Sequence, residues 1–476
     1  MVVSRRFAMA GAAALPFAAT AVVRGARAAG AVTVRINPGK ALATLPPDYM
    51  GLGFEISSVA VPGLLSAHNR TYVRLVEKLG RQGVIRIGGN TSDFSRYDAH
   101  GTAVSAPKAT VVTEANLREL KTFVDAIGWK LIWGLNLGDN RLDNAVEEAR
   151  AVATIMGDRL LALEIGNEPD LFGRAGHRSA DYNYDAWLRD YRRTKQAVRA
   201  VLPRAPFAGP DLAGAADWMT RFAKDESDIV LLTAHHYITG QANPAATIDT
   251  MLAPNPKYDA VLARFQQAAD GAKKPWRMCE TASFSGGGRQ GVSDTFAAAL
   301  WALDYLFVLA EHGCAGVNME TGVNHLGWIS HYTPIGDDGH GNYSAAPEYY
   351  GLLAFNQMPK GDVLAVDCQG NGQPGGIDLT AHAVRAGNEI CVALINKDQH
   401  QDAEVALATG GAVRVSRIMG LSADSVTAAE GMTLAGAAVG SDGRWSGRPT
   451  RIRAAADDAA QLHIPATSAT LVWLET

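Results

Sequence analysis

The sequence predicts an α/β protein in which a (β/α)8 TIM barrel is followed by an antiparallel β-sandwich domain. Between residues 47 and 360, short apolar runs alternate with amphipathic stretches of helical length. There are eight such repeats, and this number favours a closed barrel over an open sheet. From residue 361 to 476, apolar runs at the period of strands are separated by Gly, Asp, Asn and Pro, which predicts the sandwich.

Residues 1–28 are expected to be an export signal rather than part of the fold. Ser4-Arg5-Arg6-Phe7 precedes an Ala-rich apolar run, and Ala26-Arg27-Ala28 supplies a small-x-small cleavage site. The arginine pair predicts the twin-arginine route, and the apolar run is too short and too Ala-rich to span a membrane stably. We therefore expect a protein that works in the periplasm or outside the cell.

Residues 29–46 contain Val32–Ile36, which alternates like a half-buried strand and precedes the barrel. We expect this strand to join the C-terminal sheet and to make the sandwich domain discontinuous. The other expected sandwich strands are Ile377–His382, Ile390–Asn396, Glu404–Leu407, Val413–Ile418 and Leu471–Leu474. Two roles stay open for this domain, a buttress for the barrel and an independent sugar-binding module.

The barrel elements follow from the apolar periodicity. The expected strands are Tyr49–Glu55, Val84–Gly88, Leu131–Asn136, Leu160–Gly166, Pro206–Pro210, Ile229–Tyr237, Trp276–Glu280 and Gly313–Met319. The expected helices are Arg70–Leu79, Glu114–Ile127, Ala145–Met156, Tyr184–Val201, Tyr258–Ala269 and Ser293–Glu311, the last with Ser293 and Asp294 as its cap. The first and fifth crossovers have the weakest helical pattern.

Composition excludes several classes of partner and cofactor. The net charge is −4 and no basic block is present, which argues against nucleic acid and polyanion partners. The four cysteines form no CxxC pair, so neither a structural metal nor any other cofactor is expected. Cys368 and Cys391 remain candidates for a disulfide in an oxidising compartment. Oligomeric state is not indicated.

Two carboxylates, Glu168 and Glu280, end the fourth and seventh expected strands. In a barrel these carboxyl ends face each other across the mouth, where the working site lies. Glycosidic bond cleavage needs such a pair, one protonated carboxyl for the leaving oxygen and one carboxylate for the anomeric carbon. Burial and mutual repulsion are expected to keep Glu168 protonated. On its own stretch, Glu168 is equally compatible with a solvated strand-ending turn.

Polar groups recur at the other strand ends as well. His235-His236-Tyr237 ends the sixth strand, and adjacent histidines on a strand point to opposite faces, which argues against a metal site. His236 and Tyr237 are instead expected to orient Glu280 or a sugar hydroxyl. The sequence has no Gly-x-Ser-x-Gly elbow to support a serine hydrolase.

Four segments carry a family resemblance: Arg86–Phe94 (RIGGNTSDF), Ile165–Asp170 (IGNEPD), Thr233–Tyr237 (TAHHY) and Glu280–Phe296 (ETASFSGGGRQGVSDTF). They resemble the β-glucuronidase and heparanase family of retaining glycosidases, glycoside hydrolase family 79. The resemblance implies that Glu168 is the acid/base and Glu280 the nucleophile. It also implies that Asn167 binds the sugar 2-hydroxyl, and that Glu55 and Asn90 line the terminal-sugar subsite.

One position departs from the family pattern. Relatives that bind glucuronate have a tyrosine immediately before the glycine run, whereas this chain has Ser285. The backbone N–H groups of Gly286 and Gly287 remain suited to hold a carboxylate, and Tyr332 is similar to a second family tyrosine near that group. A charge-assisted hydrogen bond contributes about 1.5–3 kcal/mol, so its loss shifts preference toward a neutral or substituted sugar.

The leading hypothesis is therefore an exported, retaining, exo-acting β-glucuronidase that binds a carbohydrate or glycoconjugate. The alternatives are a β-glycosidase for another pyranoside, prompted by Ser285, then endo-acting heparanase-like cleavage, and then a non-catalytic carbohydrate-binding relic. Both carboxylates and Asn167 are present, which argues against the relic.

Overall fold

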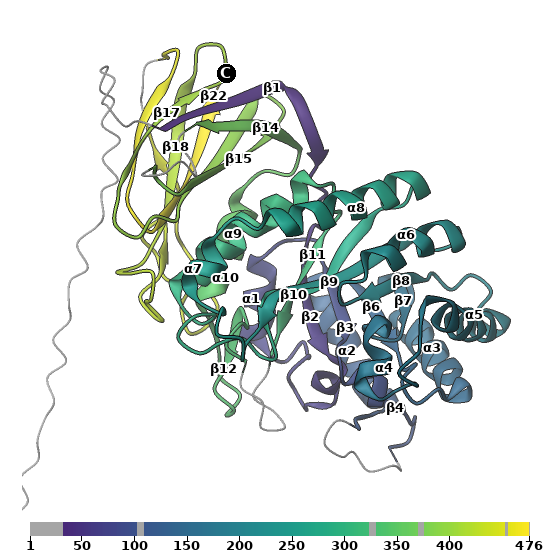
Figure 1. Cartoon of the computed structure of the whole chain (residues 1–476). Helices are drawn as coiled ribbons and strands as arrows, with labels where there is room; N and C mark the ends of the chain where they lie inside the picture. The colour runs from purple at the N-terminus through teal and green to yellow at the C-terminus, as the bar shows by residue number, and fades with distance from the viewer. Residues whose placement is uncertain (1–31, 102–108, 323–329, 370–375, 453–455, 476) are drawn as a thin grey trace, which may run out of the picture.

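The computed structural model describes residues 32–101, 109–322, 330–369, 376–452 and 456–475. It contains a parallel barrel wrapped by helices and a separate sheet domain beside it (Figure 1). This arrangement confirms the predicted fold class. The expected export signal, residues 1–28, lies outside the described residues, and no described helix combines the length and the apolar character needed to cross a membrane.

The barrel consists of parallel strands in the order β7-β6-β3-β2-β11-β10-β9-β8. The isolated bridge between Leu163 and Phe207 joins β7 to the start of the β8 segment, so the sheet nearly closes. All eight predicted strands are present within a few residues of their expected ends. Their bounds are Met50–Glu55 (β2), Val84–Gly88 (β3), Lys130–Leu135 (β6), Leu160–Ile165 (β7), Ala208–Leu212 (β8), Leu231–Gly240 (β9), Trp276–Ser285 (β10) and Val317–Thr321 (β11).

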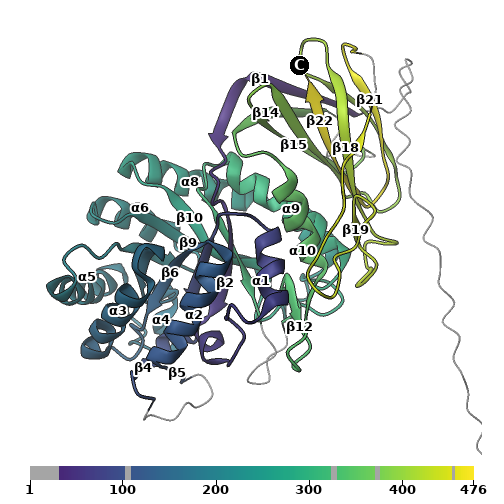
Figure 2. The ribbon, with the colours of Figure 1, turned by 180° about the vertical axis from the view of Figure 1, so that it is seen from behind.

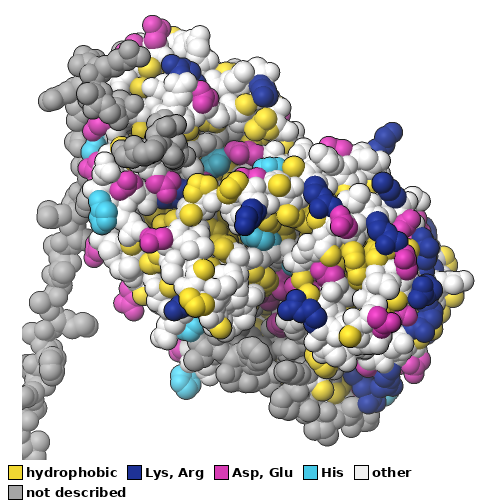
Figure 3. Space-filling view, viewed as in Figure 1, with side chains coloured by type: hydrophobic (Ala, Val, Ile, Leu, Met, Phe, Trp, Pro, Cys, Tyr) yellow, Lys and Arg dark blue, Asp and Glu magenta, His cyan; other side chains and the backbone are white. Residues whose placement is uncertain are grey.

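The outer helices surround this sheet (Figures 1 and 2). Those anticipated from the sequence are Arg70–Lys78 (α1), Glu114–Ile127 (α2), Leu142–Met156 (α3), Tyr184–Val201 (α5), Pro256–Ala272 (α8) and Phe296–Glu311 (α9). Four more were not anticipated: Phe172–Ala175 (α4), Ala216–Asp225 (α6), Ile248–Leu252 (α7) and Pro347–Gln357 (α10). Lys and Arg side chains gather over the helices farthest from the sheet domain (Figure 3).

The predicted cap of α9 is wrong. The helix begins at Phe296 with Thr295 in the N-cap position. Ser293 and Asp294 lie in the preceding turn, where the Asp294 carboxylate accepts the Gly291 N–H at 2.6 Å. Their side chains therefore stabilise the glycine-rich loop after β10 rather than the first turn of the helix.

The sheet domain is built from one path of strands, β19-β18-β22-β16-β15-β14-β1-β17-β21, with β20 paired to β18. Their bounds are Val32–Thr44 (β1), Asp362–Gln369 (β14), Leu379–Ala386 (β15), Glu389–Asn396 (β16), Ala403–Ala408 (β17), Arg414–Ser422 (β18), Thr433–Leu434 (β19), Thr450–Arg451 (β20), Ala460–Ile464 (β21) and Ser468–Glu475 (β22). The strands of this domain enclose an apolar core of their own, which includes Val34, Leu394 and Leu474.

The N-terminal strand joins this domain, as predicted. β1 pairs antiparallel with β14 and parallel with β17, so the sheet contains a parallel pair that the sequence did not indicate. Residues at opposite ends of the described chain therefore share one sheet and one core.

Cys368 and Cys391, the two candidates for a disulfide, are not paired, because all four cysteines are free. Cys391 is buried with its sulfur 3.0 Å from Met358 Sδ, and Cys368 contacts the Leu379 carbonyl oxygen at 3.5 Å. Each thiol is thus accounted for by local packing.

The barrel interior is layered, as in other closed barrels. A small apolar layer from β3, β6, β7, β8, β9 and β10 includes Val84, Ile132 and Ala162. Above it lies a layer of buried polar side chains that contains Arg86, Glu164 and Asp211. The carboxyl ends of the strands then open into a cavity. The floor beneath this cavity is therefore formed by buried, charged side chains.

Candidate active site

Glu168 projects into the cavity because the chain turns sharply after β7. Gly166 and Glu168 both have positive φ, 81° and 50°, and a non-glycine residue in this region is uncommon and strained. The Glu168 N–H donates to the Asp211 carbonyl at 2.9 Å, and Pro169 starts the following turn. Backbone contacts therefore fix an unfavourable conformation that aims this carboxyl at the barrel mouth.

Glu280 is held at both oxygens. The Tyr237 hydroxyl donates to its Oε1 at 2.8 Å, and Arg86 Nη1 donates to its Oε2 at 2.7 Å. The residue is 5% exposed. Each carboxyl oxygen therefore has its own donor, and the two hydrogen bonds hold the side chain in one orientation at the barrel mouth.

The two glutamates lie close together. One oxygen of Glu168, one oxygen of Glu280 and a ring nitrogen of His235 all lie within 4.8 Å of one another. His235 Nδ1 is 3.1 Å from Glu168 Oε1 and 3.8 Å from Glu280 Oε2. Retaining glycosidases have carboxyl groups about 5–5.5 Å apart, whereas inverting enzymes need room for a water molecule. The separation here fits the retaining geometry.

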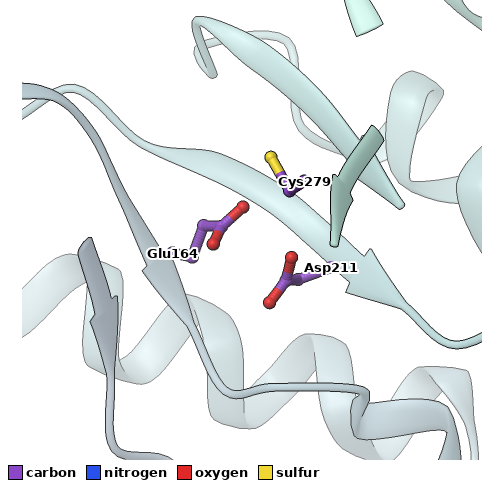
Figure 4. A group of neighbouring side chains, drawn as sticks. All are labelled: Glu164, Asp211 and Cys279. Carbon is purple, nitrogen blue, oxygen red and sulfur yellow. The ribbon is translucent and has the colours of Figure 1, made fainter. Parts of the chain in front are cut away.

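Arg86 organises the layer below these carboxyls. Its side chain is fully buried and contacts Glu164 at 3.2 Å, Asp211 at 2.6 Å and Asn167 Oδ1 at 2.8 Å, besides Glu280. Figure 4 shows the Glu164 and Asp211 carboxyls converging from β7 and β8. Removal of the guanidinium would leave several buried acids without their cation.

The neighbouring charges set opposite protonation states in this cluster. Burial raises the pKa of Glu168, and the Glu280 charge adds to this effect against the opposing hydrogen bond from His235. Burial and the charge of Asp211 raise the pKa of Glu164 to about 7. In Asp211, Arg86 and His235 outweigh burial and lower the pKa well below its usual range. The pKa of Glu168, the carboxyl positioned as a proton donor, is therefore shifted in the direction that favours its protonated form.

Two groups of side chains have the spacing of metal ligands, Glu164–Asp211–Cys279 and Glu168–His235–Glu280. In the first group Arg86 already supplies a cation to both carboxyls, and burial raises the pKa of the Cys279 thiol, as do the two neighbouring acids. In the second, the protonated form of His235 is favoured, because Asp211 and Glu280 outweigh burial and raise its pKa. A protonated imidazole is not a metal ligand. Ion pairs and hydrogen bonds among the described residues thus already engage members of both groups.

The cavity at the barrel mouth measures about 640 Å³. Its lining includes most of the residues expected to bind substrate: Glu55, Asn90, Tyr237, Ser285, Gly286, Gly287 and Tyr332. Both Glu168 and Glu280 open into it. The wall nearest the turn after Glu168 is largely apolar and contains Phe94, Leu171, Ala175, His177 and Ala213. A polar side suited to a sugar thus lies opposite an apolar side.

Asn167 lies beneath the cavity rather than along its wall. The Asp93 carboxylate accepts its backbone N–H at 2.9 Å, and Arg86 donates to its Oδ1. Its Nδ2 is buried and has no hydrogen-bond partner among the described residues. A buried amide with one free donor is suited to bind a ligand oxygen.

The prediction for His236 is wrong. Its side chain points away from the barrel axis, where Nδ1 is 3.0 Å from the Tyr305 hydroxyl and the ring stacks on Tyr258. Burial lowers its pKa to about 3, so the ring stays neutral. The adjacent His235 occupies the place that the sequence analysis gave to His236.

Sequence reasoning also missed Arg86, Asp211 and Glu320 as parts of the site. Asp211 and Glu320 both end barrel strands, which was the signal used for Glu168 and Glu280. Arg86 is a charged residue in the middle of a five-residue buried strand, where an unpaired charge is not tolerated. That pattern alone indicates an ion-pair network inside the barrel.

The fold and the paired carboxyls define the scaffold of a (β/α)8-barrel glycoside hydrolase. No family model matches the chain. A β-glucuronidase of Aspergillus niger is 26% identical over 355 residues, which cover 66% of this chain and 63% of that protein. A protein of the same name from Neurospora crassa is 28% identical over 358 residues, covering 64% and 62%. The chain thus spans a little under two thirds of the length of these relatives.

Solved structures agree on the fold. The 4-O-α-L-rhamnosyl-β-D-glucuronidase of Fusarium oxysporum superposes with a TM-score of 0.74 at 22% identity, covering 92% of this chain and 99% of that one. A family 51 α-L-arabinofuranosidase of Bifidobacterium longum gives 0.69 at 13% identity, covering 94% and 100%. These structures show the fold alone. The sequence relatives, which include a bovine heparanase at 25% identity over 269 residues, bear out the resemblance to the β-glucuronidase and heparanase family, glycoside hydrolase family 79.

Proposed function

We propose that this protein is a retaining β-glycosidase, most specifically an exo-acting β-glucuronidase. The observation that carries the proposal is the pair of Glu168 and Glu280, whose oxygens approach within 4.8 Å across one cavity. Their surroundings differ in a way that supports double displacement, because Arg86 and Tyr237 hydrogen-bond Glu280 whereas burial raises the pKa of Glu168.

In the first step a Glu280 oxygen attacks the anomeric carbon while the glycosidic C–O bond breaks. Glu168 transfers its proton to the departing oxygen, and the sugar remains as an ester of Glu280. This ester removes the negative charge of Glu280, so the pKa of Glu168 falls and its carboxylate can take a proton from water. The water oxygen then attacks the anomeric carbon, which releases the sugar and restores both carboxyls.

A glucuronide is favoured by the names of the fungal relatives and by the cavity wall formed by Ser285, Gly286, Gly287 and Tyr332. The second candidate is a neutral or substituted pyranoside. Ser285 supports it, and so does the lining itself, whose described residues include four glutamates and neither lysine nor arginine. A lining of this charge also disfavours a sulfated polyanion, so endo-acting cleavage of such chains ranks third.

A binding relic remains as the non-enzymatic alternative, since one human relative, 24% identical over 279 residues, is named an inactive heparanase. A mechanism-based cyclitol aziridine distinguishes the two. The proposed enzyme takes one covalent label on Glu280, and prior addition of a competing glycoside slows the labelling. A relic takes no label at this residue.

Substrate choice is tested by kcat/KM on the 4-nitrophenyl β-glucuronide, β-glucoside, β-galactoside and β-xyloside. A clear glucuronide preference is the expected result. A preference for a neutral sugar would support the second candidate and would mean that the C6 subsite has been rebuilt on an unchanged pair of glutamates.

We also propose that the protein is exported by the twin-arginine route, which the residues Ser4-Arg5-Arg6-Phe7 support. Replacement of Arg5 and Arg6 by lysine is expected to retain the protein in the cytoplasm with an uncut leader. Unchanged export of this variant would assign the leader to another route.

A further inference from the structure

Glu320 is a carboxyl of the cavity wall to which double displacement assigns no role. It lies near the end of β11, is 3% exposed and lines the cavity together with Glu55, Glu168 and Glu280. Its Oε2 is buried and has no hydrogen-bond partner among the described residues. A buried carboxyl oxygen without a partner costs free energy, which is recovered when a ligand supplies the missing hydrogen bond.

The position of this carboxyl is fixed by the neighbouring strand. Gly53 of β2 is paired with Glu320 of β11 in the barrel, and a Cβ atom at Gly53 would clash with the Glu320 carboxylate. The absence of a side chain at this position makes room for the glutamate. The side chain therefore lies against β2 between the Glu55 end of that strand and the Glu280 end of β10.

Charged and titratable groups face Glu320 from several elements. The acids are Glu55 and Glu280, the cations are Arg86 and His235, and the phenols are Tyr332 and Tyr72. Burial, then Glu280 and then Glu55 raise the pKa of Glu320 well above its usual value, and Arg86 and His235 oppose the shift only in part. Among the described residues no cation hydrogen-bonds this carboxyl, in contrast to Glu280. The raised pKa of Glu320 favours its protonated form, which has an O–H to donate.

The proposed substrate needs such a donor. A glucuronate carries a carboxylate at C6, and the described cavity lining has no lysine or arginine to receive it. The resemblance places Tyr332 near that carboxylate, and Glu320 acts on the charge of Tyr332 more strongly than any other acid does. An ionised Glu320 would repel the substrate, whereas a neutral one can share its proton.

We infer that Glu320, in its protonated form, is the specificity-determining residue that donates a hydrogen bond to the C6 carboxylate of the substrate, in the place of the phenol that Ser285 has lost. This inference rests on the proposed glucuronidase function. It makes glucuronide recognition depend on pH, because loss of the Glu320 proton converts a donor into a repelling charge. A neutral sugar does not carry this penalty.

The test is the ratio of kcat/KM for 4-nitrophenyl β-glucuronide to that for the β-glucoside, measured across pH 5 to 8. Protonation of Glu168 affects both substrates and cancels in this ratio. The wild-type ratio is expected to fall about 10-fold or more with rising pH. In Glu320→Gln the ratio should be flat, since the amide donates at every pH. Glu348→Gln, which changes a buried acid outside the cavity lining, is the matched control and should retain the wild-type slope.

The inference would be overturned if the glucuronide-to-glucoside ratio of the wild type did not change with pH, or if Glu320→Gln kept the wild-type change. In either case hydrolysis by the wild type would still support the proposed function. Absence of hydrolysis in the wild type would overturn the proposed function instead. Calorimetry then decides the role of Glu320, with an iminosugar that carries a carboxylate at C6 and its hydroxymethyl counterpart. Weaker binding of the carboxylate compound at high pH, absent in Glu320→Gln, supports the inference, and equal pH dependence of both compounds contradicts it.

Discussion

At the level of single residues, Glu168 and Glu280 differ in the side chains that contact them more than in their exposure to solvent. Glu280 is hydrogen-bonded by a guanidinium and a phenol, whereas Glu168 has only the His235 ring beside it. His235 lies between the two and is itself held by Asp211 at 2.7 Å. Arg86 and His235 thus supply two positive charges to the acids around them, which keeps the cluster close to neutral when Glu164 and Glu168 are protonated.

Glu280→Gln is expected to lower kcat/KM by at least 10⁴-fold, about 5.4 kcal/mol of transition-state stabilisation, because an amide cannot form the glycosyl ester. The amide can still receive the Tyr237 hydrogen bond, so the fold should be kept. Rates with a 4-nitrophenyl glycoside and circular dichroism of the same preparation check both points. Full activity in this variant would remove Glu280 from the mechanism.

Glu168→Gln should harm substrates according to their leaving groups. Proton transfer by a positioned acid contributes about 10²–10⁴-fold, and an activated aryl leaving group needs little of it. We therefore expect a large loss on an alkyl glycoside and a small one on the 2,4-dinitrophenyl glycoside. In the wild type the raised pKa of Glu168 extends activity to higher pH than an exposed glutamate would allow, and this alkaline limb should disappear in the variant. Equal losses on both substrates would argue against the acid role.

The strand-end signal selected Glu168 and Glu280, which line one cavity, but it was not applied to Asp211 and Glu320. Prediction was wrong where the facing of a side chain had to be chosen. Tyr237 hydrogen-bonds Glu280 inside the barrel, and strand alternation then puts His235 inside and His236 outside. The expectation that His236 and Tyr237 both face the site broke this rule. For Arg86 the position of a charge in a buried strand indicates an ion-pair network, but it does not identify the partners. Glu164 and Asp211 become its partners through contacts between β3, β7 and β8, which are defined only once the barrel closes.

At the level of elements, the loop after β10, the strand that contains Glu280, forms part of the proposed carboxylate subsite. Gly286, Gly287 and Gly288 have φ of 83°, 97° and 78°, a backbone that only glycine adopts readily. Ser285 precedes this run and lines the cavity. Ser285→Tyr adds a phenol there and should raise the glucuronide-to-glucoside ratio about 10-fold, in line with one hydrogen bond to a charged group. An unchanged ratio would show that other groups determine this preference.

The helix α10 contains a different kind of buried acid. Glu348, in its first turn, is 1% exposed, and neither carboxyl oxygen has a partner among the described residues. Burial raises its pKa well above the usual 4.5. Folding then retains a proton that the unfolded chain releases above about pH 4.5, so stability falls as pH rises toward the raised pKa.

Glu348→Gln cannot ionise, so it should be more stable than the wild type by an amount that grows with pH, about 1.4 kcal/mol per pH unit over this range. Thermal unfolding at pH 4, 6 and 8 measures the difference, and the pH 4 values should nearly coincide. A constant difference at all three pH values would mean that ionisation of Glu348 is not the cause.

The prediction of a helix or strand depended on how clearly its apolar residues showed the period of that element in the local sequence. The eight barrel strands are nearly continuous apolar runs and were located. The helix α6 was missed, although Ala216, Met219, Phe222 and Ala223 form one buried face, because it follows a strand with an unusual Gly-Pro-Asp end. The α10 helix is buried on every side and lacks amphipathic periodicity, so its existence depends on tertiary packing.

At the level of the whole molecule, the sandwich is tied to the barrel through α9 and α10, which lie between the two (Figure 2). The register of β1 with β14 and β17 could not be read from the sequence, since about 320 residues separate β1 from the first of them. One apolar core continues from the barrel into the sheet domain, and a polar cluster at α9 adds to the junction. The two roles left open for the sandwich, a buttress and a sugar-binding module, stay predictions.

This cluster centres on Asp304 of α9. Its carboxylate lies 2.8 Å from His382 Nε2 on β15 and 3.0 Å from Lys397 Nζ, and it accepts a hydrogen bond from Thr380 Oγ1 at 2.7 Å. His382 also contacts Glu311 Oε1 at 2.6 Å. Although burial opposes the charge on His382, Glu311 and Asp304 raise its pKa to about 9. In Asp304, Lys397 and His382 outweigh burial and lower the pKa far below 3.8.

Both shifts give the junction a defined pH range. The raised pKa of His382 contributes stability that is complete below about pH 6.5 and is lost as pH rises through about 9. The lowered pKa of Asp304 contributes stability that is present above about pH 3.8 and is lost in stronger acid. The barrel and sandwich should therefore be held together best between these limits.

Asp304→Asn leaves the Lys397 and His382 cations without their shared carboxylate. We expect a loss on the order of 3 kcal/mol of unfolding free energy at pH 6, as for one broken partner of a buried ion pair, with a smaller loss at pH 9.5, where His382 is already neutral. Denaturant unfolding at the two pH values measures this, with Asp217→Asn on the exposed face of α6 as the control. Equal losses at both pH values would show that the cluster stabilises the junction by packing alone, without the charge on His382.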